Sequence, residues 1–320
     1  ASLRLAAPLM FLLALYPAIA NVSAASRKHG PDAHLAADFA YDLLNSMPPY
    51  GILFTYGDND TFPLWWAQEV AGIRRDVTVV CLALANTDWY MRQLRDNPTR
   101  AVDPDSLPPV WRGRVPARPD WPLHSMTDSM VGSAMGGYVV RAEQTVPLGP
   151  ITRTLHAGSF LYPSDILVMS IVRQNLGRRP VVWAATTGKA FGGLSDYVVQ
   201  RGMGFEVLTS RPDTTSPDLD LRRLAGVPLD VPTTERLVWE TYRYGGLLER
   251  EEGPLESTSS LAGSSLATPL VQLVYVYAGR EDRTRMERAL DRAARLSPNP
   301  DLRSALRLLI LDAADSADSR

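Results

Sequence analysis

Hydrophobic and polar positions in the first hundred residues follow two patterns, helical spacing and short continuous apolar runs. Helical spacing occurs in three segments: Leu35 to Leu44, Pro63 to Val70 and Trp89 to Arg95. Apolar runs typical of buried strands occur in two segments, each followed by a polar turn and a helix: Gly51 to Tyr56 and Val77 to Leu84. Two strand–helix units in succession predict a parallel sheet.

Prolines interrupt this pattern between Asn97 and Pro122, which excludes a long helix or a central strand from that segment. We expect it to be a long surface excursion. The pattern then predicts a strand, a helix, a buried strand and two short strands: Gly136 to Glu143, Ser164 to Leu176, Pro180 to Ala185, Tyr197 to Gln200 and Phe205 to Leu208. Ser210 to Ser216, rich in Pro, Asp and Thr, predicts a linker.

The last third of the chain has a helical pattern. Its segments are Thr234 to Leu248, Pro269 to Ala278, an apolar stripe of Met286, Leu290, Ala293 and Leu296, and Asp301 to Asp312. The stripe resembles part of one tetratricopeptide-type unit, although a generic helical cap is the simpler interpretation. The predicted fold class is therefore α/β. We expect a mostly parallel sheet with flanking helices over residues 27–215 and an all-α C-terminal region, tetratricopeptide-like or generic, over residues 216–320.

Residues 1–26 have the composition of a membrane or export segment. No charged residue occurs from Leu5 to Ser26, and about 20 such residues suffice to span a bilayer. The alternative is a secretory signal, because Arg4 precedes the apolar stretch and Ala18-Ile19-Ala20 is similar to a cleavage site. Both interpretations place the rest of the chain outside the cytoplasm. We expect a cell-membrane protein whose soluble domain is extracytoplasmic, in the periplasm.

Charge and metal-ligand chemistry narrow the function classes. With 33 basic and 35 acidic residues the formal net charge is -2, which gives no broad positive field for nucleic acid. Cys81 is the only cysteine, and the four histidines lack the spacing of a zinc motif. We therefore expect no nucleic-acid partner and no cofactor. A divalent cation at Asp58 and Asp60 is the minor alternative.

Polar residues that follow the first two strands form the first part of the candidate site. They are Asp58, Asn59 and Asp60 after the first strand and Asn86 and Asp88 after the second. Ligands bind at the carboxyl ends of parallel strands, and paired carboxylates there can hold sugar hydroxyls or a hard cation. The structural alternative is that Asp60 or Thr61 caps the next helix while Asp58 and Asn59 form a turn.

Four aromatic residues, Trp65, Trp66, Trp89 and Tyr90, form the second part of the candidate site. Their rings combine apolar faces with polar edges, which suits stacking on a sugar or on an acceptor peptide, and core packing is the alternative. Trp65 and Trp66 are adjacent on a predicted helix and cannot face the same direction. We expect at most one of them to be deeply buried.

Two long segments carry a family resemblance. The first is GILFTYGDNDTFPLWWAQEV from Gly51 to Val70, with DVTVV from Asp76 and NTDWY from Asn86. The second is SDILVMSIVRQNL from Ser164, with RPVVWAA from Arg179 and GLSDY from Gly193. From about Leu5 to about Leu208 the chain resembles the extracytoplasmic part of a bacterial multi-spanning membrane family of formerly unknown function. That family is similar to the animal transmembrane protein O-mannosyltransferase, placed among GT-C type glycosyltransferases.

The resemblance implies protein O-glycosylation with a lipid-linked sugar, performed by a longer protein. Its catalytic carboxylate is expected in an N-terminal membrane region that this chain lacks, so no catalytic residue is assigned here. We expect this chain to be accessory or acceptor-binding, with the membrane, the missing transmembrane region, a lipid-linked sugar and a protein acceptor as partners. The alternatives are a free-standing exported glycan- or peptide-binding module and a metal-dependent enzyme centred on Asp58 and Asp60.

Overall fold

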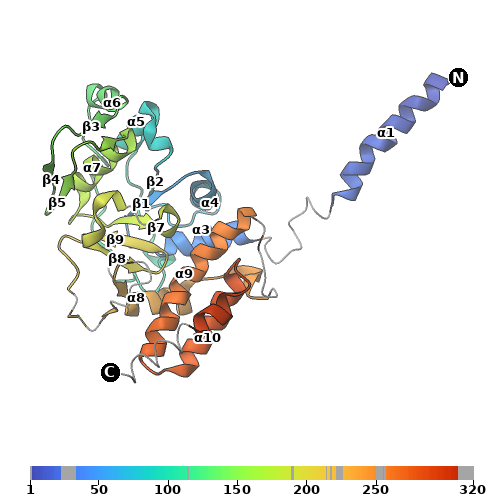
Figure 1. The fold of residues 1–320 in the computed structure, drawn as a ribbon. Helices are drawn as coiled ribbons and strands as arrows, with labels where there is room; N and C mark the ends of the chain where they lie inside the picture. The colour runs from blue at the N-terminus through green and yellow to red at the C-terminus, as the bar shows by residue number, and fades with distance from the viewer. Residues whose placement is uncertain are drawn as a thin grey trace.

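The computed structural model describes residues 2–22, 34–113, 115–188, 191–213, 215–216, 218–220, 226–249, 255 and 257–308. They form an α/β fold in which a seven-stranded sheet carries helices on both faces, followed by a helical C-terminal region (Figure 1). The predicted fold class is confirmed.

The central sheet has the strand order β10-β11-β8-β9-β7-β1-β2. Its strands are β1 (Ile52–Thr55), β2 (Thr78–Cys81), β7 (Val181–Ala184), β8 (Val198–Arg201), β9 (Gly204–Val207), β10 (Leu219–Asp220) and β11 (Leu229–Asp230). The pairs β1–β2, β1–β7 and β11–β8 are parallel, and the pairs β7–β9, β8–β9 and β10–β11 are antiparallel. The predicted parallel pairing therefore describes the β7–β1–β2 end of the sheet and the β11–β8 pair. Elsewhere, a two-residue connection with Gly202 at φ +56° joins β8 to β9, and so short a loop permits only an antiparallel hairpin.

Helices cover both faces of the sheet because its strands are apolar on both sides. Leu53 packs in one apolar cluster with α3 (Leu35–Asn45) and α4 (Asp58–Glu69). Ile52 and Phe54 pack in a second cluster with α5 (Asp88–Asp96) and α7 (Pro163–Asn175). Successive side chains of a strand point to opposite faces, so a continuous apolar run such as β1 serves both clusters.

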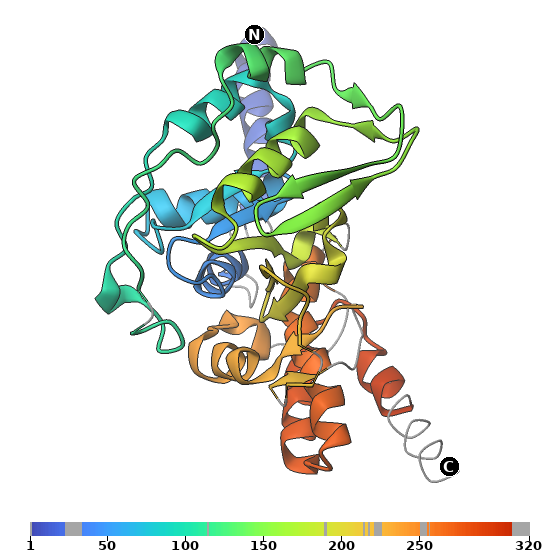
Figure 2. The same ribbon diagram turned by 90° about the vertical axis from the view of Figure 1, so that its left-hand side faces the viewer.

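The C-terminal helices share the first cluster with α3. They are α8 (Val231–Arg236), α9 (Ser257–Gly279) and α10 (Arg283–Leu296), and a further helical stretch occupies residues 302–308. Helices α9 and α10 pack side by side, as Figures 1 and 2 show. Helix α9 begins twelve residues before the segment predicted from Pro269, and Pro269 lies inside it.

The segment Thr234 to Leu248 has the predicted helical character, but its helix is interrupted. The helix passes through a π-helical segment and ends at Tyr242, whose ψ of 140° is extended. The amides of Arg243 and Tyr244 donate to the buried Asp42 carboxylate over 2.8 and 3.4 Å instead of continuing the helical bonds. A carboxylate on α3 thus ends the helix, which periodicity in the local sequence does not reveal.

The segment between α5 and α7 differs most from the sequence-based expectation. The predicted strand at Gly136 to Glu143 is reduced to β3 (Tyr138–Val139), which pairs with β6 (Phe160–Leu161). Between them lies an unpredicted hairpin of β4 (Gln144–Leu148) and β5 (Ile151–Leu155), preceded by the short helix α6 (Asp128–Ala134). The excursion from Asn97 to Pro122 contains no long helix, as expected. Part of it is nevertheless core, because Leu107, Val110 and Trp111 are buried.

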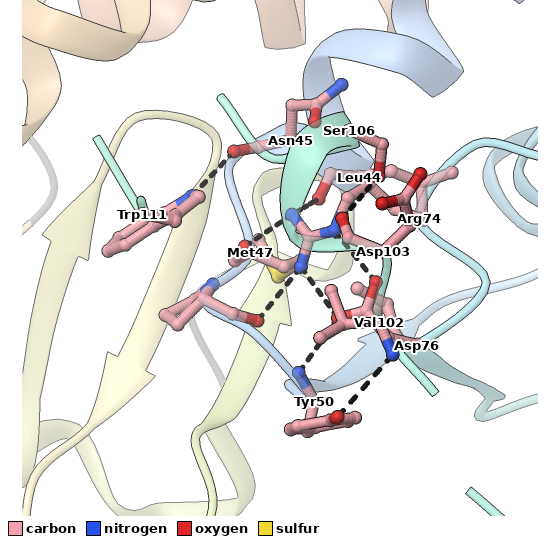
Figure 3. A network of polar contacts seen from close by, with 12 residues as sticks. Leu44, Asn45, Met47, Tyr50, Arg74, Asp76, Val102, Asp103, Ser106 and Trp111 are labelled. Carbon is pink, nitrogen blue, oxygen red and sulfur yellow. Dashed lines mark hydrogen bonds and ion pairs between the residues drawn. The ribbon is translucent and has the colours of Figure 1, made fainter. Parts of the chain in front are cut away.

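A buried ion pair fixes the amino ends of β1 and β2 (Figure 3). The Arg74 guanidinium donates to Asp76 Oδ1 over 2.9 Å and to the carbonyls of Leu44 and Met47 over 3.2 and 2.7 Å. Asp76 Oδ2 also accepts from the Tyr50 amide at 2.9 Å. Arg74 and Tyr50 both adopt positive φ, at 43° and 59°, a conformation that these contacts stabilise. The turns that lead into the two strands are therefore rigid.

The N-terminal segment forms helix α1 (Ser2–Ala20), whose described apolar side chains are exposed. Within it, Met10–Ala20 is a shorter apolar helical stretch among the described residues. Among the described residues, one helix is long and apolar enough to cross a membrane, Ser259–Gly279, and 61% of its apolar window is buried within the fold. That stretch of α9 is a core helix here, so its composition does not mark a span.

Candidate functional site

The edge strand β2 lies at the bottom of a groove between α4 and α5. Strand β2 has β1 on one side and no strand on the other, and Figure 1 shows it between these two helices. The groove has a volume of about 630 Å³ and is lined by Phe62, Trp65, Gln68, Glu69, Arg75, Val77, Thr78, Val79, Leu84, Trp89, Tyr90, Gln93, Leu94, Asn97, Pro98, Thr99 and Arg100. We name it the edge groove. Its volume is in the range of pockets that hold small molecules or short polymer segments.

Four aromatic rings form a continuous wall across the edge groove. Phe62 stacks on Trp65 with ring centroids 5.5 Å apart, and Trp65 lies 6.4 Å from Tyr90. Tyr90 in turn meets Trp89 edge to face at 5.5 Å. Phe62 and Trp89 remain 54% and 52% exposed, although burial of such rings normally stabilises a fold. The outer two rings are therefore available to a ligand.

Side chains from both helices occupy polar groups of the β2 edge. Gln68 Nε2 donates to the carbonyl of Val77 over 2.8 Å and to that of Arg74 over 2.9 Å. From the other side, the Tyr90 hydroxyl accepts from the amide of Cys81 over 3.0 Å. A strand edge with free amides and carbonyls pairs readily with another chain. Gln68 and Tyr90 restrict that pairing, so a ligand in the edge groove meets mainly side chains.

The rim of the edge groove is charged. Glu69 is the only carboxylate among its described lining residues, and it pairs with Arg100 at 2.6 Å and with Arg75 at 3.5 Å. All three side chains are about half exposed, so the pairs themselves contribute little to stability. Two arginines against one carboxylate leave the rim with a net positive charge. Gln93 and Asn97 add exposed amide groups for hydrogen bonding.

A buried histidine supports the α5 wall. The His124 Nδ1 atom accepts from the amide of Met126 at 3.3 Å, so Nε2 carries the proton and donates to the Met91 carbonyl at 2.8 Å. Burial lowers the pKa of His124 below its usual value, which keeps the ring neutral. Arg95, near the other end of α5, donates to the Met126 carbonyl and to Asp128. These contacts hold Trp89 and Tyr90 opposite α4.

The acidic residues between β1 and α4 are engaged mainly in local structure. The Asp60 carboxylate accepts from the amides of Tyr56 and Gly57 over 2.8 and 2.9 Å, and from the hydroxyl of Thr186. Asp60 is only 2% exposed. These are the bonds of a helix cap, made by the third residue of α4 back to the residues before the helix. Asp58 and Asn59 are exposed in the first turn of α4, and Asp58 Oδ1 accepts from the Asn59 amide at 2.9 Å.

The polar residues after β2 also have local partners. The exposed Asn86 accepts from the amide of Ser164 at 3.2 Å, which ties the end of β2 to the start of α7. Asp88 pairs with Arg92 one turn along α5 at 2.7 Å, and this pair lowers the pKa of Asp88. Within the part of the chain that the structure describes, no group of three or more His, Cys, Asp or Glu side chains is placed to hold a metal ion.

The structure brings three of the nine candidate residues together in the edge groove: Trp65, Trp89 and Tyr90. Trp66 points away from it and is 47% exposed, so neither member of the adjacent tryptophan pair is deeply buried. The remaining five, Asp58, Asn59, Asp60, Asn86 and Asp88, do not line it. Sequence reasoning missed Phe62, Gln68 and Arg100. Phe62 carried a usable signal, because it lies one helical turn before Trp65.

Comparison with known proteins gives one family match. A family described as TMEM260-associated domain 2 matches residues 36–113, and TMEM260 is an animal protein O-mannosyltransferase. The matched segment includes both the acidic residues after β1 and every residue that lines the edge groove. No curated protein and no solved structure matched the chain. The match links this part of the fold to a glycosyltransferase-related membrane protein.

Proposed function

We propose that the chain is the extracytoplasmic, acceptor-binding part of a membrane glycosyltransferase, and that the edge groove holds the acceptor polypeptide. One observation carries the proposal. A continuous aromatic wall with exposed outer rings lies within the segment that matches a domain associated with a protein O-mannosyltransferase. The exposed apolar α1 and the extracytoplasmic location expected from the sequence fit a part attached to a membrane.

The groove chemistry suits an extended segment rich in Ser, Thr and Pro. Proline rings and threonine methyl groups pack on exposed Trp and Phe faces, and aromatic-lined grooves are a recurring site for such segments. Gln68 and Tyr90 already bond polar groups of the β2 edge. The acceptor therefore binds through its side chains and through the rim groups, and does not add a strand to the sheet. Segments rich in Ser, Thr and Pro are also typical O-glycosylation substrates.

The same geometry supports an accessory role without catalysis in this chain. Transfer to a hydroxyl needs a general base placed to remove the proton. Glu69, the one carboxylate among the described lining residues, is already engaged in ion pairs with Arg75 and Arg100. The base is therefore expected in the membrane region of the longer protein. The isolated chain should transfer no sugar.

The test is a turnover assay with the longer protein that contains the membrane region. The donor is a polyprenyl phosphate sugar and the acceptor a Ser/Thr/Pro peptide. Trp89→Ala should raise the acceptor KM about tenfold at unchanged kcat, because it removes binding energy common to ground and transition states. Trp66→Ala, an equally exposed tryptophan outside the groove, should leave both constants unchanged. Turnover by the isolated chain, or a loss in kcat alone for Trp89→Ala, would contradict the proposal.

A further inference from the structure

A second cavity is lined by residues of β5 and of the segment that follows β7. Its volume is about 540 Å³, and its lining is mostly polar, with Arg153 from the middle of β5 among its residues. The family match ends before this region begins. The cavity and the edge groove have no lining residue in common.

Arg153 is half-buried, and it differs from the buried Arg74 and Arg179 in having no polar partner among the described residues. Among the described residues no acceptor forms a hydrogen bond or an ion pair with its guanidinium, and its Nη1 atom is buried without a partner. Arg74 by contrast bonds Asp76 and three carbonyls, and Arg179 bonds the Tyr50 carbonyl and two threonine hydroxyls. The nearest acidic influence on Arg153 is Asp165, whose carboxylate accepts from the Tyr162 amide at the start of α7.

The Nη1 donors of this half-buried guanidinium are buried without an acceptor, and such unmet donors cost stability. The guanidinium carries five N–H donors and stays protonated in proteins, so it cannot escape the cost by losing its charge. Burial lowers the pKa of Arg153, which is the expected sign of an uncompensated desolvation penalty. Proteins retain such groups where a ligand supplies the missing charge.

The loop that follows β7 is shaped around this guanidinium. Gly193 adopts φ +76°, and a Cβ at this position would lie 3.0 Å from Arg153 Nε. A side chain at this position would be strained by the positive φ and would crowd the Arg153 side chain. Gly193 therefore lies directly against the Arg153 side chain. Among the described residues, β5 pairs only with β4, so its other edge carries no strand.

We propose that this cavity binds the phosphate group of a small phosphate ester, with Arg153 as its principal cationic contact. Ser159 and Ser195 line the same cavity, and their hydroxyl groups can donate to the remaining phosphate oxygens. The acidic side chain in the lining, Asp196, is already paired with Arg211 at 2.9 Å, so it does not oppose an anion. The cavity is larger than a phosphate and leaves room for an organic part such as a sugar ring.

The binding test uses the full chain with three probes: glucose 1-phosphate, inorganic phosphate and glucose. Calorimetric titration should give saturable binding of glucose 1-phosphate that weakens with added salt, and none of glucose. Arg153→Gln should weaken this binding about tenfold or more, because a hydrogen-bonded charge pair is lost. Arg141→Gln removes the same charge from an exposed position outside the cavity and should change the affinity less than about twofold.

A second measurement separates ligand binding from a structural role. If Arg153 is kept for a ligand, Arg153→Met should not lower the melting temperature of the unliganded chain, because the change removes a half-buried guanidinium whose Nη1 atom has no acceptor and keeps a side chain of similar length. Inorganic phosphate that binds as tightly as glucose 1-phosphate supports the same anion site with the free ion as ligand. The proposal is overturned if neither phosphate probe saturates, if Arg153→Gln binds as well as the parent chain, or if Arg153→Met lowers the melting temperature.

Discussion

The acidic residues after β1 and the edge groove beside β2 lie close together in the sequence but use their side chains in different ways. Asp60 has its oxygens bonded by the amides of Tyr56 and Gly57 and by Thr186. In the edge groove, by contrast, the aromatic rings of Phe62 and Trp89 are about half exposed. The conspicuous acidic motif thus supports the fold, and the aromatic residues that follow it retain contact area for a ligand.

The contrast shows that neighbouring residues at one strand–helix junction can have different roles, one structural and one in ligand contact. A carboxylate at the third position of a helix neutralises orphan amides, which fixes where α4 begins. That start then sets the direction in which Phe62 and Trp65 project, one and two turns later. Asp60 therefore affects the edge groove only through the placement of α4.

The largest effect that separates the two regions should come from Asp60→Ala. The change leaves two backbone amides and a threonine hydroxyl without their acceptor, and we expect the free energy of unfolding to fall by about 3 kcal/mol. Asp58→Ala, which removes an exposed carboxylate from the same turn, should cost no more than about 0.5 kcal/mol. Urea unfolding of both variants measures the difference. Equal losses would show that Asp60 does not hold the start of α4.

A smaller effect is expected from Tyr90→Phe in the edge groove. The ring and its aromatic contacts remain, but the Cys81 amide loses its acceptor, so stability should fall by about 1 kcal/mol. Amide hydrogen exchange at Cys81 should become faster, while exchange at the other end of the sheet, in β8 and β9, stays unchanged. Unchanged exchange at Cys81 would show that the hydroxyl does not protect the strand edge.

Acidification should lower the free energy of unfolding by a still smaller amount, through His124, which packs behind α5. Because burial lowers the pKa of His124, the unfolded chain binds the proton more tightly, and stability is lost as pH falls through the range in which imidazole titrates. Arg95 also disfavours the charged ring, whereas Asp96 favours it. Between about pH 7.5 and about pH 5.5, the parent chain should lose more stability than His124→Gln, which keeps the other three histidines. Parallel losses in the two proteins would exclude His124 as the cause.

The smallest effect concerns metal ions. Since Asp60 is engaged by amides and Asp58 is exposed without a second free carboxylate beside it, we expect Mg²⁺, Ca²⁺ or Mn²⁺ to shift the melting temperature by less than about 1 °C. A larger, saturable shift that disappears in Asp58→Ala would instead support the metal-binding alternative and transfer the site to the acidic turn.

Hydrophobic patterning predicted the elements that form the parallel end of the sheet and its covering helices. It identified α3, β1, α5, α7 and β7, because each has one clear period and ends at a polar or proline-containing turn. It failed where distant residues decide the structure. The Asp42 carboxylate ends the helix before Tyr242, and β11 joins the sheet by pairing with β8 from beyond the predicted linker. The β4–β5 hairpin escaped because Pro147 is unusual in a strand and is tolerated there at a sheet edge.

The edge groove could be predicted only in part. Its tryptophans and Tyr90 stood out by residue type, and the expectation that Trp65 and Trp66 face different directions followed from helix geometry. The charged rim of the groove could not be predicted from the sequence. Arg100 comes from a segment predicted to be a surface excursion, and Glu69 has the pattern of an ordinary exposed helix residue. Sequence shows which side chains can stack, and the fold decides which of them share a wall.

The most direct test of the edge groove as an acceptor site compares two similarly exposed tryptophans that differ in their position. Trp89 lies inside the groove, and Trp66 lies outside it. A Ser/Thr/Pro peptide of about eight residues, long enough to occupy the groove, is titrated calorimetrically into the full chain and into each alanine variant. We expect Trp89→Ala to weaken binding about tenfold or more and Trp66→Ala to change it less than about twofold. Equal weakening by both substitutions, or no weakening by Trp89→Ala, would contradict the assignment of the edge groove as the acceptor site.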